Sequence, residues 1–409
     1  MAEEHPKLRH IEAFPIEREG QRFVCLRDPL HFADQVITVS MAAIPILQCL
    51  DGKHSLQEIQ AEFLRATEQN LPLEQLEGFV AKLDQALMLA SPHFAKHKAE
   101  LIRAFRAAAI REPAHAGGAY PADREAITRM FDKHFEPPKG PGKSESKPHK
   151  PPIAVVSPHI DLRRGGPGFA WAYHQLAQAP KVDTFIILGV AHSGTKNRFA
   201  GTRKHYRTPL GVAQTDGALV DSLASKLQFD LFEDEFAHRS EHSIEFQVVY
   251  LQHALGEHYP FQIAPILVGS FHDLVASGEQ PMSDPQVAGF AAALREVIAG
   301  AGKTVCVVAG VDLAHIGGRF GDGFTVNQDV RQQLEFDDRE MLKVLEDCDA
   351  PEFFRLIHQE QDSRRICGFP TLYTMLSAVD VKRGELLYYD QSYEKDTNSV
   401  VSFASMSFR

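Results

Sequence analysis

Ile153-Ala154-Val155-Val156-Ser157-Pro158-His159 is the stretch that decides the fold, because a short apolar run of this kind is typical of a buried strand and it leads to a histidine. Phe185-Ile186-Ile187-Leu188-Gly189-Val190-Ala191-His192 repeats the pattern. Two more apolar runs, 263–268 and 305–308, are also followed by polar residues. Ligands of open α/β sheets bind beyond the carboxyl ends of the strands. We therefore expect the two histidines to converge there, as the ligands of a metal ion do.

From residue 151 onward, these strand-like runs alternate with segments of helical character at 168–177, 216–227 and 287–299. Such alternation is typical of βαβ units, in which a mostly parallel sheet is covered by helices. The near-continuous apolar character of the strands fits burial on both faces of the sheet. The sequence therefore predicts the α/β class, with a core sheet flanked by helices.

The N-terminal part of the chain has a different pattern. Strand-like residues at 22–26 and 36–39 precede a helix that follows Ser40, a second helix with capping-box spacing at Ser55-Leu56-Gln57-Glu58, and a third at 73–87. Strands followed by three short helices predict a small winged-helix-like domain.

These patterns divide the chain into three parts. We place the winged-helix-like domain at 1–94, a basic helical connector at 95–110 and the α/β domain at 111–409. Within the last part, residues 137–152 are rich in Pro, Gly, Lys and Ser, which cannot bury an apolar face. This stretch is predicted to be a flexible loop.

Composition narrows the class of protein. The 43 basic and 54 acidic residues of the 409-residue chain give a net charge of -11, which disfavours binding to nucleic acid. Five cysteines at wide spacing, without a CxxC pair, indicate reduced thiols. No secretion signal follows the polar N-terminus, and no apolar run approaches the roughly 18 residues of a membrane span. We expect a cytoplasmic protein that binds neither nucleic acid nor membrane.

Three residues have the chemistry of metal ligands. His159 and His192 follow separate strands, and Cys367 stands in Arg364-Arg365-Ile366-Cys367-Gly368, just before an apolar helix. Two arginines and a helix N-terminus are expected to favour the thiolate of Cys367, which suits a ligand or a nucleophile. Imidazole and thiolate ligands suit ferrous iron, copper and zinc, and the spacing does not choose among them.

Further residues could take part in catalysis. His242 and Glu245 are three apart in Glu241-His242-Ser243-Ile244-Glu245, so they share one face of an expected helix. His315 could serve as a general base, with Asp312 or a backbone carbonyl fixing its tautomer. Each has a purely structural alternative. A histidine can simply form a hydrogen bond with a loop, and His242 with Glu245 can be a pair on the surface of a helix.

Taken in order, these motifs resemble the Memo proteins, whose bacterial members belong to the AmmeMemoRadiSam system (protein B). Ala116-Gly117-Gly118-Ala119-Tyr120 is similar to the opening of that domain, so the resemblance covers roughly residues 111–409. It implies a fold similar to class III extradiol dioxygenases, with His159, His192 and Cys367 as metal ligands. His242 and His315 would be pocket histidines, and His315 would take the position of the dioxygenase base.

One feature departs from the family. Ile160-Asp161-Leu162 follows the first histidine, where family members often have Ala-Gly-Tyr. A carboxylate near the expected metal bears on the substrate and on the choice of metal, although not on the fold. We therefore expect Asp161, Arg163 and Glu245 to line the substrate pocket.

The N-terminal domain resembles PqqD-like winged-helix domains, which bind peptides. The resemblance is carried by Leu26-Arg27-Asp28-Pro29, by Leu50-Asp51-Gly52-Lys53-His54-Ser55 and by the closing helix up to Leu89. A structural cap on the larger domain is the alternative.

The sequence thus predicts a mononuclear non-haem metal site, most readily iron, with redox or oxygen-linked chemistry on an unknown small-molecule or peptide substrate. A radical-SAM protein of the same system is an expected partner. Two alternatives stay open. One is a binding module for peptides or modified side chains, in which a metal is incidental; the other is a metal-dependent hydrolase.

Overall fold

The computed structural model describes residues 4–33, 35–142 and 150–409. Contacts within the chain group these residues into two compact units, Met1–Ala107 and Ala108–Arg409. Of the loop predicted to be flexible at 137–152, residues 143–149 lie outside the described part.

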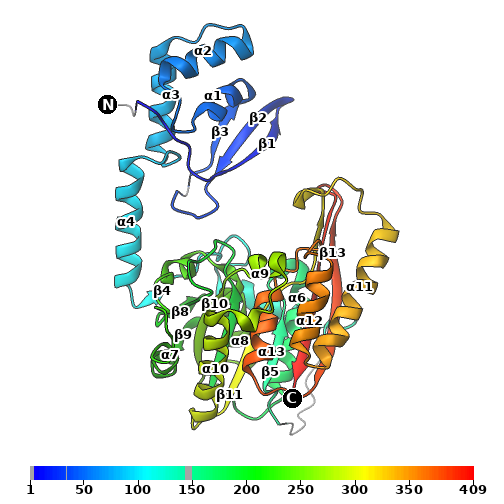
Figure 1. Ribbon diagram of the computed structural model, residues 1–409. Helices are drawn as coiled ribbons and strands as arrows, with labels where there is room; N and C mark the ends of the chain where they lie inside the picture. Colours follow the sequence, from blue (N-terminus) through cyan, green and yellow to red (C-terminus); the bar gives the residue numbers. More distant parts are fainter. Residues whose placement is uncertain (1–3, 34, 143–149) are drawn as a thin grey trace. The chain divides into compact units, whose positions relative to one another are not determined.

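The N-terminal unit combines a three-stranded antiparallel sheet with helices (Figure 1). The sheet has the order β1-β2-β3, formed by Glu12–Arg18, Gln21–Arg27 and Ile37–Ser40. The helices are α1 (Ile44–Cys49), α2 (Leu56–Thr67), α3 (Leu73–Gln85) and α4 (Pro92–Ala107). The predicted capping box is confirmed: the Ser55 hydroxyl accepts a hydrogen bond from the Glu58 amide, and the Glu58 carboxylate accepts one from the Ser55 amide. Strand β1 was not predicted, because most of its side chains are exposed.

The larger unit is built on a mixed sheet, which confirms the predicted α/β class. Its strand order is β12-β14-β5-β11-β6-β10-β9-β8-β4, with β13 paired to β14 and β7 paired to β10. The strands are β4 (Ile110–Arg111), β5 (Ala154–Ser157), β6 (Thr184–Val190), β7 (Phe199–Gly201), β8 (His205–Thr208), β9 (Gly211–Thr215), β10 (Gln262–Val268), β11 (Val305–Gly310), β12 (His315–Gly317), β13 (Gly384–Glu394) and β14 (Ser399–Phe408).

The four strands predicted from apolar runs lie side by side at the centre of this sheet. They run parallel in the order β5-β11-β6-β10. In this register Gly310 pairs with Ser157 on one side and Gly189 on the other, so neighbouring strands end at the same level. The outer strands depart from the mostly parallel prediction, since β14 joins β5 antiparallel and continues into the hairpin with β13.

Helices cover both faces of the sheet. Alternate side chains of the central strands enter separate cores: Val155 packs in one, and Ala154 and Val156 pack in the other. The first core holds helices α5 (Arg124–His134), α6 (Leu162–Ala177) and α8 (His242–Leu255). The second core holds α7 (Gly217–Ala224), α9 (His272–Ser277), α10 (Pro285–Gly300), α11 (Gln328–Glu346), α12 (Ala350–Gln359) and α13 (Phe369–Ala378).

Two glycines allow the start of α8 to lie directly on the sheet. A β-carbon at Gly310 would lie 2.7 Å from the carbonyl oxygen of Ser243, and one at Gly189 would lie 2.5 Å from the Ser243 hydroxyl. Side chains at these positions would force the helix outward. Because they are absent, the first turn of α8 lies against the ends of β6 and β11.

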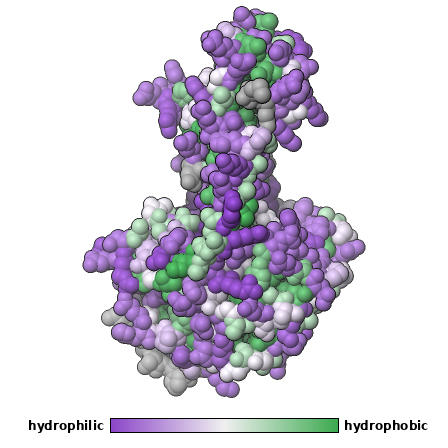
Figure 2. All heavy atoms as spheres, turned by 90° about the vertical axis from the view of Figure 1, so that its left-hand side faces the viewer, coloured by the Kyte–Doolittle hydropathy of each residue, from purple (hydrophilic) through white to green (hydrophobic). Residues whose placement is uncertain are grey.

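Hydrophilic side chains predominate on the face drawn in Figure 2. The large hydrophobic side chains exposed on the described surface, such as Phe14, Leu64 and Phe336, belong to separate elements. Within the described residues, no helix has both the length and the apolar character that a membrane crossing requires.

Candidate metal centre

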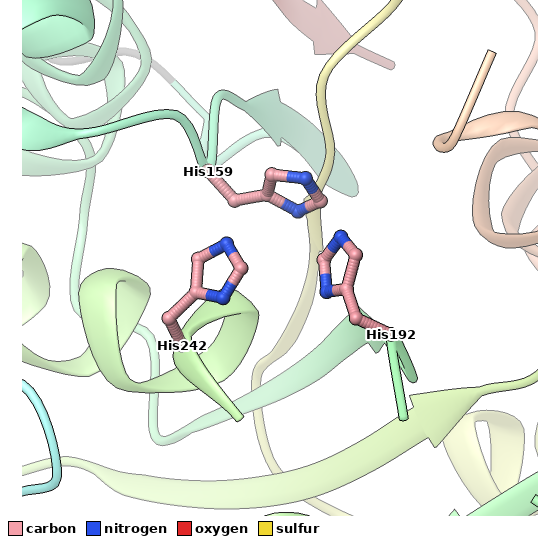
Figure 3. A group of neighbouring side chains, drawn as sticks. All are labelled: His159, His192 and His242. Atoms are coloured by element: carbon pink, nitrogen blue, oxygen red, sulfur yellow. The ribbon is translucent and has the colours of Figure 1, made fainter. Parts of the chain in front are cut away.

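Three histidines meet where the central strands end. His159 lies two residues beyond β5, His192 lies two residues beyond β6, and His242 is the first residue of α8. One ring nitrogen from each lies within 4.8 Å of the other two. Figure 3 shows the three rings around a common space. The predicted convergence of His159 and His192 is therefore found, and His242 joins them as a third nitrogen donor.

The ring of His159 is held in place by a hydrogen bond to the backbone. Its Nδ1–H donates to the carbonyl oxygen of Gly310 across 3.0 Å, at the end of β11. A neutral imidazole held in this way presents the lone pair of Nε2 to a ligand. The side chain is only 2 % exposed. Burial, followed by the nearby His192 and His242, holds the pKa of His159 well below its usual value, so the ring stays neutral as metal coordination requires.

His192 and His242 face one carboxylate. Nδ1 of His192 donates to Oε1 of Glu241 across 3.0 Å, and Nδ1 of His242 lies 3.1 Å from the same oxygen. The two rings are nearly parallel, with centroids 4.8 Å apart. Burial disfavours the charged form of His192, but the carboxylate of Glu241 outweighs it and raises the pKa of the ring. At 39 %, the side chain of His192 is the most exposed of the three.

Cys367 lies beside this cluster. Its Sγ is 3.3 Å from Nε2 of His159 and 3.7 Å from the carbonyl oxygen of Asp312. Bonds of about 2.0–2.1 Å to nitrogen and about 2.3 Å to sulfur around a tetrahedral ion place these two atoms about 3.5 Å apart. The observed separation therefore fits a histidine and a cysteine that share one ion.

The expectation that two arginines favour the thiolate of Cys367 is wrong. Burial, and next the carboxylate of Asp312, raise the pKa of the Cys367 thiol well above its usual value. Each arginine is held by ion pairs with its own carboxylates, which are Glu360 and Asp338 for Arg364 and Asp322 for Arg365. A bound cation would offset the burial cost, because coordination deprotonates a thiol.

Asp312 supports His159 rather than His315. It lies two residues beyond β11, and its Oδ1 accepts hydrogen bonds from the amides of His159 and Ile160 across 3.0 and 3.1 Å. Burial raises the pKa of Asp312 to about 7. Of the two alternatives for the tautomer of His315, the structure has the carbonyl: its Nδ1 lies 3.1 Å from the oxygen of Leu313.

His315 is a neutral side chain near the cluster. A second carbonyl oxygen, that of Arg365, lies 3.2 Å from its Nδ1, which leaves Nε2 as the acceptor of a proton. Burial lowers the pKa of His315 to about 4, and His192 adds to the effect. A histidine that is uncharged at neutral pH can act as a base.

The residues predicted to line a substrate pocket make other contacts. Asp161 is the N-cap of α6, where its side chain accepts from the Arg163 amide across 2.8 Å. The guanidinium of Arg163 donates to the carbonyl oxygen of Gly118 across 3.2 Å. These contacts place both side chains at the start of α6, next in sequence to His159. Their role toward a substrate stays a prediction.

Glu245 is fully buried and its oxygens already serve four donors. These donors are the guanidinium of Arg111, the hydroxyl of Tyr120 and the amides of Ala114 and His115. The carboxylate thus ties residues 111–120 to helix α8. Glu245, three residues after His242, therefore supports the helix that carries His242.

Sequence reasoning missed two residues. Glu241, 5 % exposed, is the N-cap of α8 and contacts two of the three histidines. His115 packs edge-on against His242, with centroids 5.8 Å apart, and its Nε2 lies 2.9 Å from the Ser240 carbonyl oxygen. A signal for Glu241 existed, because a negatively charged side chain at the N-terminus of a helix is favoured by the helix dipole.

The chain is similar to proteins of one family. A family model described as Memo-like protein matches residues 111–407. A MEMO1 family protein of Aquifex aeolicus is 28 % identical over 406 residues, which cover 98 % of this chain and 99 % of the relative. MEMO1 family proteins of Methanopyrus kandleri and Methanobrevibacter smithii are each 30 % identical, over 73 % of this chain and 99 % and 100 % of their own lengths. The match to the Aquifex protein therefore spans nearly the whole chain, whereas the matches to the two archaeal proteins span about three quarters of it.

Proposed function

This chain belongs to the Memo-like family, and from that premise we propose that its histidine cluster binds one transition-metal ion, iron(II) in the first place. The bound ion would supply redox or oxygen-linked chemistry for an unidentified substrate. The observation that carries the proposal is the meeting of three imidazoles, one ring nitrogen of each within 4.8 Å of the others, at the carboxyl end of a parallel sheet.

The donor set fits a borderline metal. His159 and His192 each have Nδ1 in a hydrogen bond, which leaves Nε2 to face a cation. His242 or Cys367 would complete the protein ligands, and nitrogen and sulfur donors suit iron, copper and zinc. The resemblance to the Memo family implies a fold similar to class III extradiol dioxygenases, and that similarity favours iron among these three metals.

The remaining groups have separate tasks. His315, neutral because burial lowers its pKa to about 4, would accept a proton from a substrate held near the ion. Asp312 would keep the backbone of His159 in place through its amide hydrogen bonds. The partial exposure of His192 leaves one side of the cluster open for substrate to enter.

Metal analysis of the whole chain, purified anaerobically without chelators, tests the proposal. We expect one iron per chain in the wild type and a loss of that iron in His159→Ala. His258→Ala is the matched control, because His258 is an exposed histidine beyond the end of α8. One zinc per chain, retained under the same conditions, would favour the metal-dependent hydrolase instead.

The binding module remains the alternative to an enzyme. A chain that neither retains nor takes up a metal would contradict the metal proposal, and the more so if His159→Ala left peptide binding intact. The PqqD-like resemblance of the N-terminal unit supports peptide binding in that case. The radical-SAM partner, which the family resemblance implies, and the cytoplasmic location, which the composition indicates, also remain proposals.

A further inference from the structure

We propose that Glu241 is a positioning residue for this metal site: its single carboxylate sets the orientation and the tautomer of both His192 and His242, so that Nε2 of each faces the cation. The inference rests on the proposed function for the cation itself. The arrangement of the two rings around Glu241 can be tested without it.

The carboxylate of Glu241 is surrounded by donors from two elements. From the turn after β6, it accepts the amide of His192 across 2.9 Å and the Nδ1–H of the same residue across 3.0 Å. From the first turn of α8, it accepts the amides of His242 and Ser243 across 2.9 and 3.0 Å. Nδ1 of His242 lies 3.1 Å from Oε1 as well. One side chain therefore joins the strand that carries one histidine to the helix that begins with another.

Glu241 is held in this position by the donors around it. Its side chain is 5 % exposed, and it accepts three amide hydrogen bonds in addition to the Nδ1–H of His192. An anionic carboxylate is only an acceptor, so each nitrogen that faces it must bring a proton. Nδ1 is thereby the protonated nitrogen of both rings.

The opposite nitrogens then share one orientation. A ring whose Nδ1–H is bonded to a carboxylate presents an unprotonated Nε2, and such outer partners also raise the basicity of the ligand. The rings of His192 and His242 lie at 20° to each other with centroids 4.8 Å apart, as expected for two imidazoles anchored to the same group. His159 needs a different anchor, the Gly310 carbonyl, because it enters from another strand.

Helix capping is the competing explanation for Glu241, and Glu241→Asp separates the two. Aspartate is a favoured N-cap, so it keeps a carboxylate for the amides of His242 and Ser243. It is shorter by one methylene, so it cannot maintain the 3.0 Å contact with Nδ1 of His192. We expect Glu241→Asp to melt close to the wild type and to bind iron(II) and zinc 10- to 100-fold more weakly, the usual effect of losing an outer-shell partner.

The measurements are competitive titration of the whole chain with iron(II) or zinc against a chromophoric chelator, and nitrogen NMR of the histidine rings in the metal-free protein. Glu241→Gln is the second variant, and it should move His192 and His242 away from the pure Nδ1–H tautomer. Glu257→Gln is the matched control, since Glu257 is an exposed glutamate beyond α8. It should change neither readout.

The outcomes separate the two proposals. Wild-type metal affinity in Glu241→Asp, or unchanged ring tautomers in Glu241→Gln, would overturn the positioning role. Failure of the wild type to bind either metal would overturn the proposed function, while the tautomers of the metal-free protein would still decide whether Glu241 orients the rings.

Discussion

The sulfur of Cys367 lies 3.3 Å from Nε2 of His159, although 208 residues separate them in the chain. The contact joins the turn after β5 to the loop before α13. It offers the candidate centre a sulfur donor in addition to the three imidazoles. Two donor sets are therefore available, one with three histidines and one with two histidines and a cysteine.

Cys367→Ala distinguishes these sets. If the thiol is a ligand, its loss should weaken iron(II) binding by more than about 100-fold, beyond the effect of removing an outer-shell partner. Cys367→Ser should fall between the alanine variant and the wild type. The measurement is chelator competition under anaerobic conditions. An affinity equal to that of the wild type in Cys367→Ala would assign the site to His159, His192 and His242 alone.

Breaking the buried ion pair of Arg111 and Glu245 should strongly destabilise the larger unit. Neither side chain is exposed, and removal of one partner leaves an uncompensated buried charge. Arg111→Met should lower the free energy of unfolding by about 3–5 kcal/mol. Arg207→Met is the control, because Arg207 pairs with Glu112 at the surface and should contribute no more than about 1 kcal/mol. Urea denaturation of both variants gives the comparison, and equal losses would contradict the account.

Close packing of α8 on the sheet predicts opposite effects of two glycine substitutions. A β-carbon at Gly310 would lie 2.7 Å from the backbone carbonyl oxygen of Ser243. Gly310→Ala should therefore lower the free energy of unfolding by about 1–3 kcal/mol through overpacking. At Gly289, an exposed position within α10, a β-carbon meets nothing within 4 Å. Gly289→Ala should stabilise by about 0.5–1 kcal/mol through helix propensity. Thermal unfolding measures both, and a neutral Gly310→Ala would show that α8 can shift freely.

His238 should make the folded state sensitive to acid. It is fully buried, with Nε2 2.9 Å from the Ala200 carbonyl oxygen and Nδ1 2.8 Å from the Tyr206 hydroxyl. Burial lowers the pKa of His238 from 6.5 to about 4. Between these values the unfolded chain binds a proton that the folded chain does not. The contribution of His238 to the free energy of unfolding is therefore fully present above about pH 6.5. It is lost as the pH drops toward 4, by about 3 kcal/mol in all, at about 1.4 kcal/mol for each pH unit.

His238→Gln should flatten that slope. The comparison is the free energy of unfolding against pH for the variant and the wild type, since other buried histidines contribute equally to both curves. Identical slopes between pH 6.5 and 4 would show that His238 does not titrate in this way.

The central strands could be predicted because both of their faces are buried. Apolar runs such as 185–188 then carry the full signal of a parallel strand, and the histidines that follow them are brought together by the register. Strand β14 is equally buried, but Ser402, Ser405 and Ser407 interrupt its apolar character. No continuous run marks it, so the antiparallel side of the sheet was not predicted.

The convergence of His159 and His192 could be predicted from their positions after two neighbouring strands, and the structure brings them together. His242 was expected as a pocket histidine, and its place as a third nitrogen donor was not predicted. The support of His159 by Asp312, and of two rings by Glu241, depends on side-chain directions that spacing does not fix. The expectation that the thiolate of Cys367 is favoured was wrong for the same reason. The carboxylates that pair with Arg364 and Arg365 come from other segments, which spacing does not reveal.

An anomalous difference map at the iron edge, from a crystal of the whole chain loaded with iron(II) anaerobically, tests the central claim most directly. We expect one strong peak about 2.0–2.3 Å from a ring nitrogen of His159 and of His192, with His242 or Cys367 as the third ligand. A map without a peak among these side chains, in a crystal whose protein was shown to be iron-loaded, would contradict it.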